Sequence, residues 1–207
     1  MDGKPFALAT ERNCKPILDV LQQELKNADT VLEIGSGTGQ HAVALGAALD
    51  HLTWQTSDLD EHHAGIRAWL ADAELANVLE PLLLDVSKAS LPPATYDAVF
   101  SANTAHIMNF ASVERMFALV AVALKENGLF CLYGPFRQAG EFNTASNAEF
   151  HRSLQARDPA MGIRHLEDLD RFATIGGMRR LRLYAMPANN YIVVWQKSSL
   201  GDNNDNA

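Results

Sequence analysis

Glycine occupies every second position of the segment Gly35–Gly39. The segment follows directly on the apolar run Val31–Ile34 and precedes a stretch with helical periodicity. Because glycine has no Cβ, such a backbone can turn tightly and leave its amides open to a ligand. The start of the next helix adds N–H donors and a partial positive charge. The pattern predicts a ligand-binding loop between a buried strand and a helix.

The spacing of the glycines narrows the choice of ligand. A dinucleotide fingerprint needs a glycine three residues after the second one, where this chain has Gln40, and no Gly-Lys-Ser/Thr follows for a phosphate loop. An acidic residue, Glu33, followed by G-x-G-x-G resembles motif one of class I methyltransferases that depend on S-adenosyl-L-methionine (SAM). That cofactor carries no phosphate, so we expect Glu33 to be tolerated and to help orient its ammonium group. A turn that only packs a helix on a sheet is the alternative.

Two aspartates follow the next predicted strands, at the edge where open α/β sheets bind ligands. Asp58 comes 19 residues after Gly39 and can accept hydrogen bonds from both ribose hydroxyls, whereas Asp85 is placed for the adenine amino group. The alternative is that both are helix N-caps or solvated loop residues. The predicted cofactor-binding residues are Glu33, Gly35, Ser36, Gly37, Gly39, Asp58, Leu59, Asp85, Val86 and Asn103.

Asn103 and His106 follow the fourth predicted strand and are the predicted catalytic residues. In the class I methyltransferase fold this loop lies beside the methyl group, and methyl transfer needs a positioned and deprotonated acceptor. His106 is a candidate general base because imidazole titrates near neutral pH; a packed histidine bonded to a backbone carbonyl is the alternative. Five other histidines are expected on the surface: His41, His51, His62, His63 and His151.

Polar residues near other strand ends are candidates for binding the methyl acceptor. An Asn-Asn pair lies where the last hairpin is expected to turn on the ligand side, although asparagine is also common in turns. Arg137 lies on that side as well. An arginine at the start of the first helix could instead form a surface ion pair. The predicted substrate residues are Arg12, Asn13, Tyr133, Asn143, Asn189 and Asn190.

Short apolar runs alternate with helix-period segments along most of the chain. Strands are expected at 31–34, 52–57, 82–84, 98–100 and 129–133, and helices at about 13–27, 38–49, 66–73, 113–124 (ended by Gly128) and 165–175. Ser146 and Glu149 have the spacing of a capping box for one more helix. The alternating segment 180–184 and the run 191–195, joined by a Pro-Ala-Asn-Asn turn, predict a closing strand hairpin.

This order of elements predicts a three-layer α/β/α sandwich. We expect the class I methyltransferase (Rossmann-like) fold, with a seven-stranded, mostly parallel sheet containing one antiparallel strand. Residues 1–200 are expected to form a single domain, and the polar segment 201–207 a disordered tail.

Composition limits the class of partner. The chain has 207 residues, 47% of them hydrophobic and 20% charged, with a formal net charge of −8. No apolar run can span a bilayer, and the negative charge disfavours nucleic acid, so we expect neither a membrane nor a nucleic-acid partner. The start of the chain shows no secretory signal, and its two cysteines show no metal-ligand spacing. We expect a cytoplasmic protein with no metal site.

The sequence resembles the domain of unknown function 938 family of class I SAM-dependent methyltransferases, of the methyltransferase-like protein 26 type. The resemblance implies the methyltransferase fold and SAM as cofactor, with S-adenosyl-L-homocysteine (SAH) as product, but no substrate. In this chain Asn103-Thr104-Ala105-His106-Ile107 stands where the family usually has Asn-Met-Ile-His-Ile. The matching segments are Glu11–Asn13, Leu32–His41, Trp54–Asp60, Leu83–Val86, Ser101–Ile107, Tyr133–Phe136, Ser146–Asn147, Arg157–Pro159 and Met186–Asn190.

Three functions compete at this point. The favoured one is a SAM-dependent methyltransferase acting on a small molecule, because only the segment 135–165 and the N-terminal piece remain to enclose a substrate. A non-catalytic module that binds SAM or SAH, or a partner protein, is the alternative. A nicotinamide oxidoreductase is disfavoured by Gln40 and by the lack of a Tyr-x-x-x-Lys pair.

Overall fold

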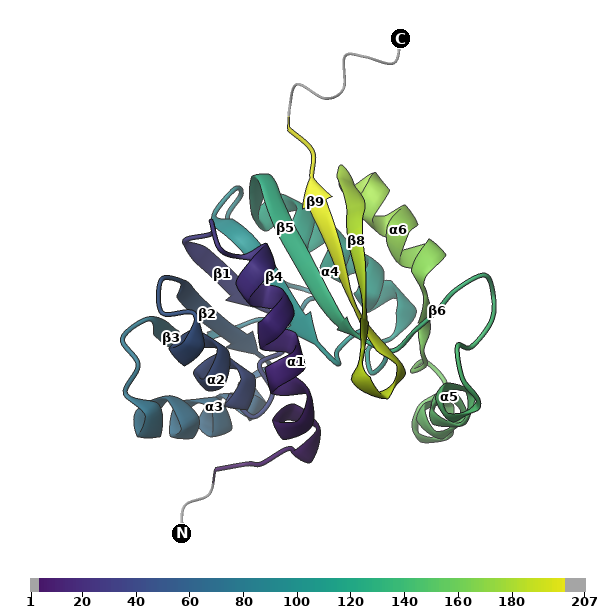
Figure 1. The fold of residues 1–207 in the computed structure, drawn as a ribbon, viewed down its shortest axis with the longest axis horizontal. Coiled ribbons are helices and arrows are strands. Elements are labelled where there is room, and N and C mark those ends of the chain that lie inside the picture. Colours follow the sequence, from purple (N-terminus) through teal and green to yellow (C-terminus); the bar gives the residue numbers. More distant parts are fainter. Residues whose placement is uncertain (1–3, 200–207) are drawn as a thin grey trace.

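The main sheet contains seven strands in the order β3-β2-β1-β4-β5-β9-β8 (Figure 1). The computed structural model describes residues 4–199, so the segment 201–207 predicted as a disordered tail lies outside the described residues. The strands are β1 (Thr30–Glu33), β2 (Thr53–Asp58), β3 (Val78–Leu83), β4 (Tyr96–Ala102), β5 (Leu124–Gly134), β8 (Met178–Met186) and β9 (Asn190–Lys197).

The direction of the strands confirms the predicted fold class. The pairs β1–β2, β1–β4, β2–β3 and β4–β5 are parallel. Strand β9 is antiparallel to both β5 and β8, so β8 runs in the same direction as the parallel strands. The last two strands form the predicted hairpin. The carboxyl ends of β1 to β5 therefore meet at one edge of the sheet.

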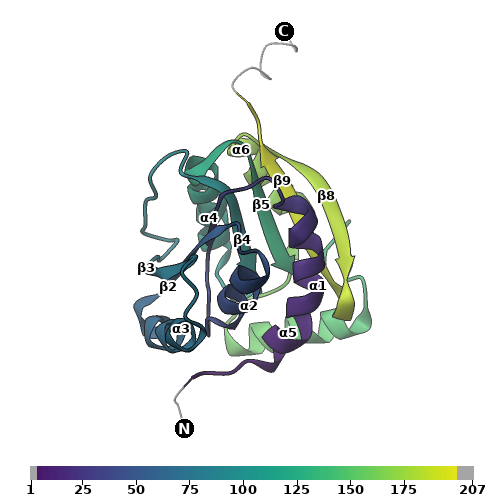
Figure 2. The ribbon, with the colours of Figure 1, turned by 60° about the vertical axis from the view of Figure 1, so that its left-hand side comes forward.

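Helices cover both faces of the sheet (Figures 1 and 2). One face packs on α1 and α2 through residues such as Val31 and Phe100. The opposite face packs on α4 and α6 through Leu32 and Val99. Adjacent strand residues point to opposite faces, which is why the strands read as continuous apolar runs. The helices are α1 (Leu8–Glu24), α2 (Gln40–Ala48), α3 (Asp60–Ala73), α4 (Phe110–Ala123), α5 (Ala145–Arg157) and α6 (Leu166–Ile175).

Several element boundaries differ from the sequence predictions. Helix α1 begins at Leu8, five residues before the expected start, because residues 8–12 have no buried position and carry no apolar periodicity. Helix α4 ends at Ala123, well before Gly128, because the chain becomes extended at Leu124 and enters β5. Strand β3 begins at Val78, four residues early, because Glu80 and Pro81 interrupt its apolar run.

The segment between β5 and β8 also departs from expectation. The N-cap of α5 is Thr144, whose hydroxyl accepts from the amide of Asn147 at 3.3 Å, so Ser146 lies inside the helix and the predicted capping box is wrong. A second, two-stranded parallel sheet, β6 (Phe136–Arg137) with β7 (Arg164–His165), was not predicted. Strands of two residues carry too little periodicity to be detected.

Candidate functional site

A cavity of about 550 Å³ lies where β1, β2, β3 and β4 end. This volume is within the range of small-molecule and cofactor sites, roughly 300–1,000 Å³. Its position at the carboxyl ends of parallel strands is where open α/β sheets bind ligands. Seven of the predicted cofactor-binding residues line it: Gly35, Gly37, Asp58, Leu59, Asp85, Val86 and Asn103.

The first two glycines of the loop have left-handed backbone conformations and different surroundings. Gly35 has φ +75°, and a Cβ there would lie 2.6 Å from Cγ2 of Thr104, so only glycine allows this approach to the loop after β4. Gly37 has φ +58°, and a Cβ there would meet no atom within 4 Å. The backbone of Gly37 is therefore bare toward the cavity, as a ligand lying against the loop requires.

Gly39 and Ser36 do not line the cavity and support the loop from behind. Gly39 is the left-handed N-cap of α2, and its Cβ would lie 3.0 Å from Cα of Ile66, so it lets α2 pack closely on α3. The hydroxyl of Ser36 donates to Glu33 at 2.8 Å and accepts from the amide of Ser57 at 3.2 Å. The packing alternative thus holds for Gly39, while Gly35 and Gly37 border the cavity.

The carboxylate of Asp58 joins the glycine loop to the start of α3. Its Oδ2 accepts from the amide of Gly37 at 2.7 Å, and its Oδ1 accepts from the amide of Leu59 at 2.7 Å. The N-cap of α3 is Leu59, so Asp58 is not the helix cap that was the alternative. A carboxylate has about four lone-pair sites, so Asp58 keeps capacity for two further donors at the cavity wall.

Asp85 also lines the cavity but is more exposed. Its Oδ1 accepts from the hydroxyl of Ser87 at 2.6 Å and from the amide of Ser87 at 3.0 Å, and Lys88 lies 3.2 Å from Oδ2. The hydrogen bonds from Ser87 are the main reason that the pKa of Asp85 is lowered. Asp85 therefore stabilises its own loop, as the alternative holds, and borders the cavity together with Val86.

Glu33 is buried beneath the loop and does not line the cavity. Its carboxylate accepts from Nε1 of Trp54 at 3.1 Å and from the hydroxyl of Ser36 at 2.8 Å. Burial raises the pKa of Glu33 to about 7. These contacts make Glu33 a support for Ser36, and its placement gives no basis for the expected contact with a ligand ammonium.

The two predicted catalytic residues lie in different surroundings. Asn103 lines the cavity and has a left-handed backbone with φ +60°. Its backbone N–H donates to the carbonyl of Tyr133 at 2.9 Å. His106 is only 7% exposed, and its ring packs edge-on against Phe150 at 5.4 Å between centroids. Burial, with smaller contributions from nearby arginine charges, lowers the pKa of His106 to about 4. The ring is therefore neutral at pH 7 and a weaker base than free imidazole.

The predicted substrate residues fall into separate groups, and none of them lines the glycine-loop cavity. Asn13 is buried, and its Oδ1 lies 2.7 Å from Nε2 of His41, which makes two buried polar groups partners. Burial raises the pKa of Tyr133, and a hydrogen bond with Asn13 offsets part of this increase. Arg12 is exposed on α1.

Asn143 and Asn189 lie next to α5, where both contact Asn147, which is not among the predicted site residues. Nδ2 of Asn147 donates to Oδ1 of Asn143 at 2.7 Å and to the carbonyl of Asn189 at 3.1 Å. Asn190 instead bonds the carbonyl of Pro187 at 3.2 Å, which is local turn chemistry. These amides satisfy one another and leave fewer groups for a substrate.

Two histidines expected on the surface are buried. His63 is 4% exposed and bonds the carbonyl of Asp58 at 3.1 Å, and His41 is 7% exposed with Asn13 as partner. The position of His41 four residues before Leu45, on the buried face of α2, is a signal that could have revealed it.

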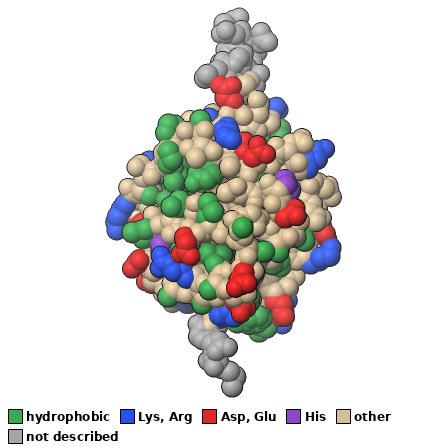
Figure 3. Space-filling view, turned by 90° about the vertical axis from the view of Figure 1, so that its left-hand side faces the viewer, with side chains coloured by type: hydrophobic (Ala, Val, Ile, Leu, Met, Phe, Trp, Pro, Cys, Tyr) green, Lys and Arg blue, Asp and Glu red, His purple; other side chains and the backbone are tan. Residues whose placement is uncertain are grey.

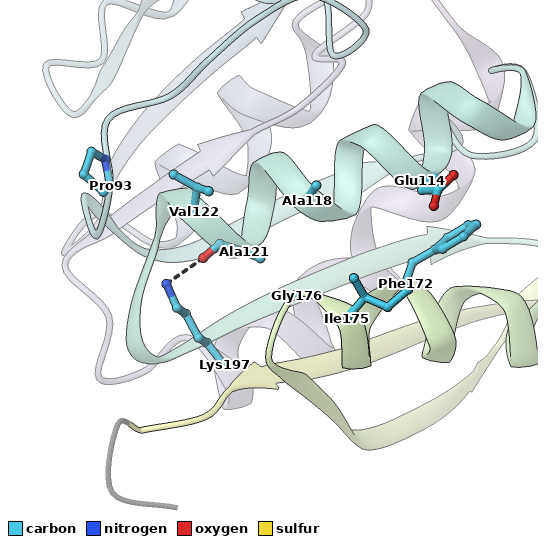
Figure 4. Close-up of a pocket in the computed structure, with 9 residues that line it drawn as sticks. All are labelled: Pro93, Glu114, Ala118, Ala121, Val122, Phe172, Ile175, Gly176 and Lys197. Carbon is cyan, nitrogen blue, oxygen red and sulfur yellow. Dashed lines mark hydrogen bonds between the residues drawn. The ribbon is translucent and has the colours of Figure 1, made fainter. Parts of the chain in front are cut away.

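A second cavity, of about 510 Å³, lies between α4 and α6 (Figure 4). Its wall is mostly apolar, with Ala118, Val122 and Ile175 among its lining residues. The ammonium group of Lys197 lies at one end, where it donates to the carbonyls of Ala121 at 2.6 Å and Leu124 at 2.8 Å. Glu114 is the other charged residue of the lining, so the groove lacks the cluster of polar groups that a polar cofactor needs.

The face that carries β3 shows acidic and basic side chains interspersed (Figure 3). Within residues 4–199 no group of three or more histidine, cysteine, aspartate or glutamate side chains is placed to hold a metal ion. Within the same residues no helix combines the length and apolar character needed to cross a bilayer.

A model of a protein family described as "Protein of unknown function (DUF938)" matches residues 4–197. The match includes the glycine loop and every predicted site residue.

Solved structures share the fold at low sequence identity. An O-methyltransferase family protein from Burkholderia thailandensis is 16% identical to this chain with a TM-score of 0.79. The superposition covers 92% of this chain and 58% of that protein. Human N-acetylserotonin methyltransferase in complex with SAM is 14% identical with a TM-score of 0.77, covering 92% and 53%. PigF with SAH is 16% identical with a TM-score of 0.75, covering 91% and 63%. The chain thus spans little more than half the length of these proteins and has their class I methyltransferase fold.

Proposed function

The chain belongs to the DUF938 family, and we propose that it is a SAM-dependent methyltransferase of the methyltransferase-like protein 26 type, acting on a small molecule. The observation that carries the proposal is the pairing of Asp58 with the amide of Gly37 at 2.7 Å on the wall of the cavity. This pairing sets a carboxylate beside a bare, left-handed backbone, which suits a ribose that carries no phosphate better than a pyrophosphate.

The residues of the cavity fit the parts of a sulfonium nucleoside. Asp58 would accept hydrogen bonds from the two ribose hydroxyls, and Asp85 with the amide of Val86 would bind the adenine edge. The loop Gly35–Gly37 and Asn103 would bind the amino-acid end. When bound, SAM supplies a methyl group activated for displacement, and the chain has to bind and orient both reactants.

We assign Asn103 to orienting the reactants, because it alone of the two predicted catalytic residues borders the cavity. His106 is neutral at pH 7. It would take a proton only from a methyl-accepting substrate that reaches the loop after β4 from the side of α5. Such an acceptor is more acidic than an aliphatic alcohol, since a base with a pKa of about 4 is otherwise too weak. Asn13, Tyr133, Asn143 and Asn189, which are among the predicted substrate residues, would then lie along the path of that acceptor.

Titration calorimetry with SAH tests the proposed cofactor. We expect wild-type protein to bind SAH, and Asp58→Ala to weaken binding by at least about tenfold, since a hydrogen bond to a charged group is worth about 1.5–3 kcal/mol. Asp60→Ala removes the same charge two residues away and should leave the affinity within about twofold of wild type. No binding by wild type, or equal losses in both variants, would contradict the proposal.

Methyl transfer itself needs a separate experiment. Incubation of the protein with isotopically labelled SAM, at a concentration near its dissociation constant, and a fractionated small-molecule extract should yield a labelled product with wild type and clearly less with Asp58→Ala. Binding of SAH without any turnover would instead favour the non-catalytic module.

A further inference from the structure

A smaller polar cavity, of about 280 Å³, lies between α5, the β6–β7 sheet and the start of α6. Four of its lining residues are basic or can become so: Arg137, His151, Arg164 and His165. A single carboxylate, that of Asp168, belongs to the lining. In a chain with a net charge of −8, this is a local reversal of sign. None of these residues lines the glycine-loop cavity.

The guanidinium of Arg137 lacks the partner that such a group normally has. Its Nε is buried and has no hydrogen-bond acceptor among the described residues. The nearby carboxylate of Asp168 is paired with Arg171 instead, at 3.1 Å. The guanidinium of Arg137 lies over the ring of Phe142 instead, with 4.8 Å from Cζ to the ring centroid. A buried donor without an acceptor is unfavourable, so an incoming acceptor would be stabilised there.

His151 is held with its proton on the nitrogen that remains free. The amide of Ile163 donates to Nδ1 at 3.1 Å, so Nδ1 carries no proton and a neutral ring carries it on Nε2. Burial first, and then the charges of Arg137, Arg164 and His165, lower the pKa of His151 and favour this neutral form. Phe142 packs on the same ring at 5.1 Å between centroids, so one aromatic side chain positions both Arg137 and His151.

Arg164 is a fixed positive charge in the same wall. Its Nε donates to the carbonyl of Ala105 at 3.0 Å, and its Nη2 donates to the carbonyls of Ala160, at 2.8 Å, and of Met108. These acceptors are neutral, so they orient the guanidinium without neutralising it. Burial lowers the pKa of Arg164, and the charge of Arg137 lowers it further. The two guanidiniums thus repel each other unless an anion lies between them.

We propose that this cavity binds a small molecule through a carboxylate or phosphate group, with Arg137 as the principal ligand, the Nε2–H of His151 as a second donor and Arg164 as a fixed charge. Guanidinium groups recognise such oxyanions by paired, charge-assisted hydrogen bonds. Phe110, Met161 and Ile163 in the same lining provide apolar contact for the remainder of the molecule. The proposal does not rest on the proposed function, although Arg164 bonds the carbonyls of Met108 and Ala160, which also line the glycine-loop cavity.

Nuclear magnetic resonance of the wild-type protein tests the site directly through the buried Nε–H of Arg137. Inorganic phosphate, succinate and chloride are titrated separately at constant ionic strength and pH. The account predicts a saturable shift of this resonance with phosphate, with succinate or with both, and none with chloride. The oxyanion that saturates identifies which of the two groups the cavity takes.

Arg137→Gln removes the principal ligand of the anion. Arg179→Gln removes an exposed arginine on β8 and is the matched control. Arg137→Gln should weaken phosphate or succinate binding, measured by calorimetry, at least tenfold, while Arg179→Gln should change it less than twofold. Equal shifts with all three anions, no saturable shift with phosphate or succinate, or equal affinities in the two variants would overturn the proposal. The wild-type titration decides the matter even where Arg137→Gln fails to fold.

Discussion

The glycine-loop cavity and the α4–α6 groove have nearly the same volume, about 550 and 510 Å³, and opposite chemistry. The first is bordered by open backbone at Gly37, by the carboxylates of Asp58 and Asp85 and by the amide of Asn103. The second is bordered mostly by apolar helix side chains, and the ammonium of Lys197 is turned onto backbone carbonyls. Size therefore does not locate the chemistry of this protein.

The difference follows from which parts of the elements meet. Strand ends bring a turn, and thus unpaired amides and polar side chains, to one edge of the sheet. The groove forms between the sides of two helices, whose backbone groups are already bonded within the helix. Only the first arrangement can present several polar groups to a single ligand.

Gly37→Val is expected to give the largest effect, on the affinity for SAH. The added side chain would enter the open space beside the loop, where no atom lies within 4 Å. We expect the affinity to fall by about a thousandfold, about 4 kcal/mol. The fold should lose only about 1–2 kcal/mol, the cost of a left-handed backbone in a residue with a Cβ. Calorimetry and urea unfolding measure the two quantities, and an unchanged affinity would remove Gly37 from the site.

Glu33→Gln should change the pH dependence of stability. Because the folded protein raises the pKa of Glu33 from 4.5 to about 7, it holds the proton more tightly than the unfolded chain. The resulting stabilisation is complete below pH 4.5 and is lost as the pH rises through 7, amounting to about 3 kcal/mol.

The difference in stability between wild type and Glu33→Gln reports the titration of Glu33 alone. The buried histidines are present in both proteins, and their lowered pKa values change the stability with pH in the opposite direction. Between pH 5 and pH 8, urea unfolding should show wild type losing about 2–3 kcal/mol relative to Glu33→Gln, because a part of the stabilisation is already lost at pH 5. A constant difference would mean that Glu33 is ionised at both pH values and does not support Ser36 as a protonated acid.

Asp85→Ala should weaken SAH binding by about 1 kcal/mol, less than Asp58→Ala, because an exposed hydrogen bond is worth about 0.5–1.5 kcal/mol. Ser87→Ala removes the partner that holds the Asp85 carboxylate at 2.6 Å and should have a smaller effect. A larger loss for Asp85→Ala than for Asp58→Ala would reverse the assignment of ribose and adenine.

Ile175→Ser should have the smallest effect. This side chain lines the groove and is 74% exposed, so the variant should fold and bind SAH within about twofold of wild type. A tenfold loss of affinity would show that the two cavities communicate, and the comparison between them would no longer hold.

The sequence was sufficient to predict the sheet and most of the residues at its carboxyl edge. Gly37 and Asp58 each follow a buried strand, and a parallel sheet brings such positions together whatever the details of packing. Glu33 shows the limit of such a prediction. Successive side chains of a strand point to opposite faces, so spacing alone does not tell whether Glu33 faces the ligand or the protein interior. Its partner Trp54 lies on the neighbouring strand, 21 residues away.

The segment 135–165 was much less predictable. Strands β6 and β7 are two residues long, and the contact of Arg137 with Phe142 and the position of His151 depend on how α5 packs. Likewise, Asn147 bonds Asn189 across 42 positions of sequence. Such contacts follow no periodic pattern, so the polar residues of this region could be named as candidates but not grouped.

A crystal structure of the protein grown with saturating SAH tests the central claim most directly. The account predicts the ribose hydroxyls within hydrogen-bonding distance of the Asp58 carboxylate, the adenine beside Asp85 and Val86, and the amino-acid end against Gly35–Gly37. SAH bound in the α4–α6 groove, or a glycine loop without ligand under these conditions, would contradict it.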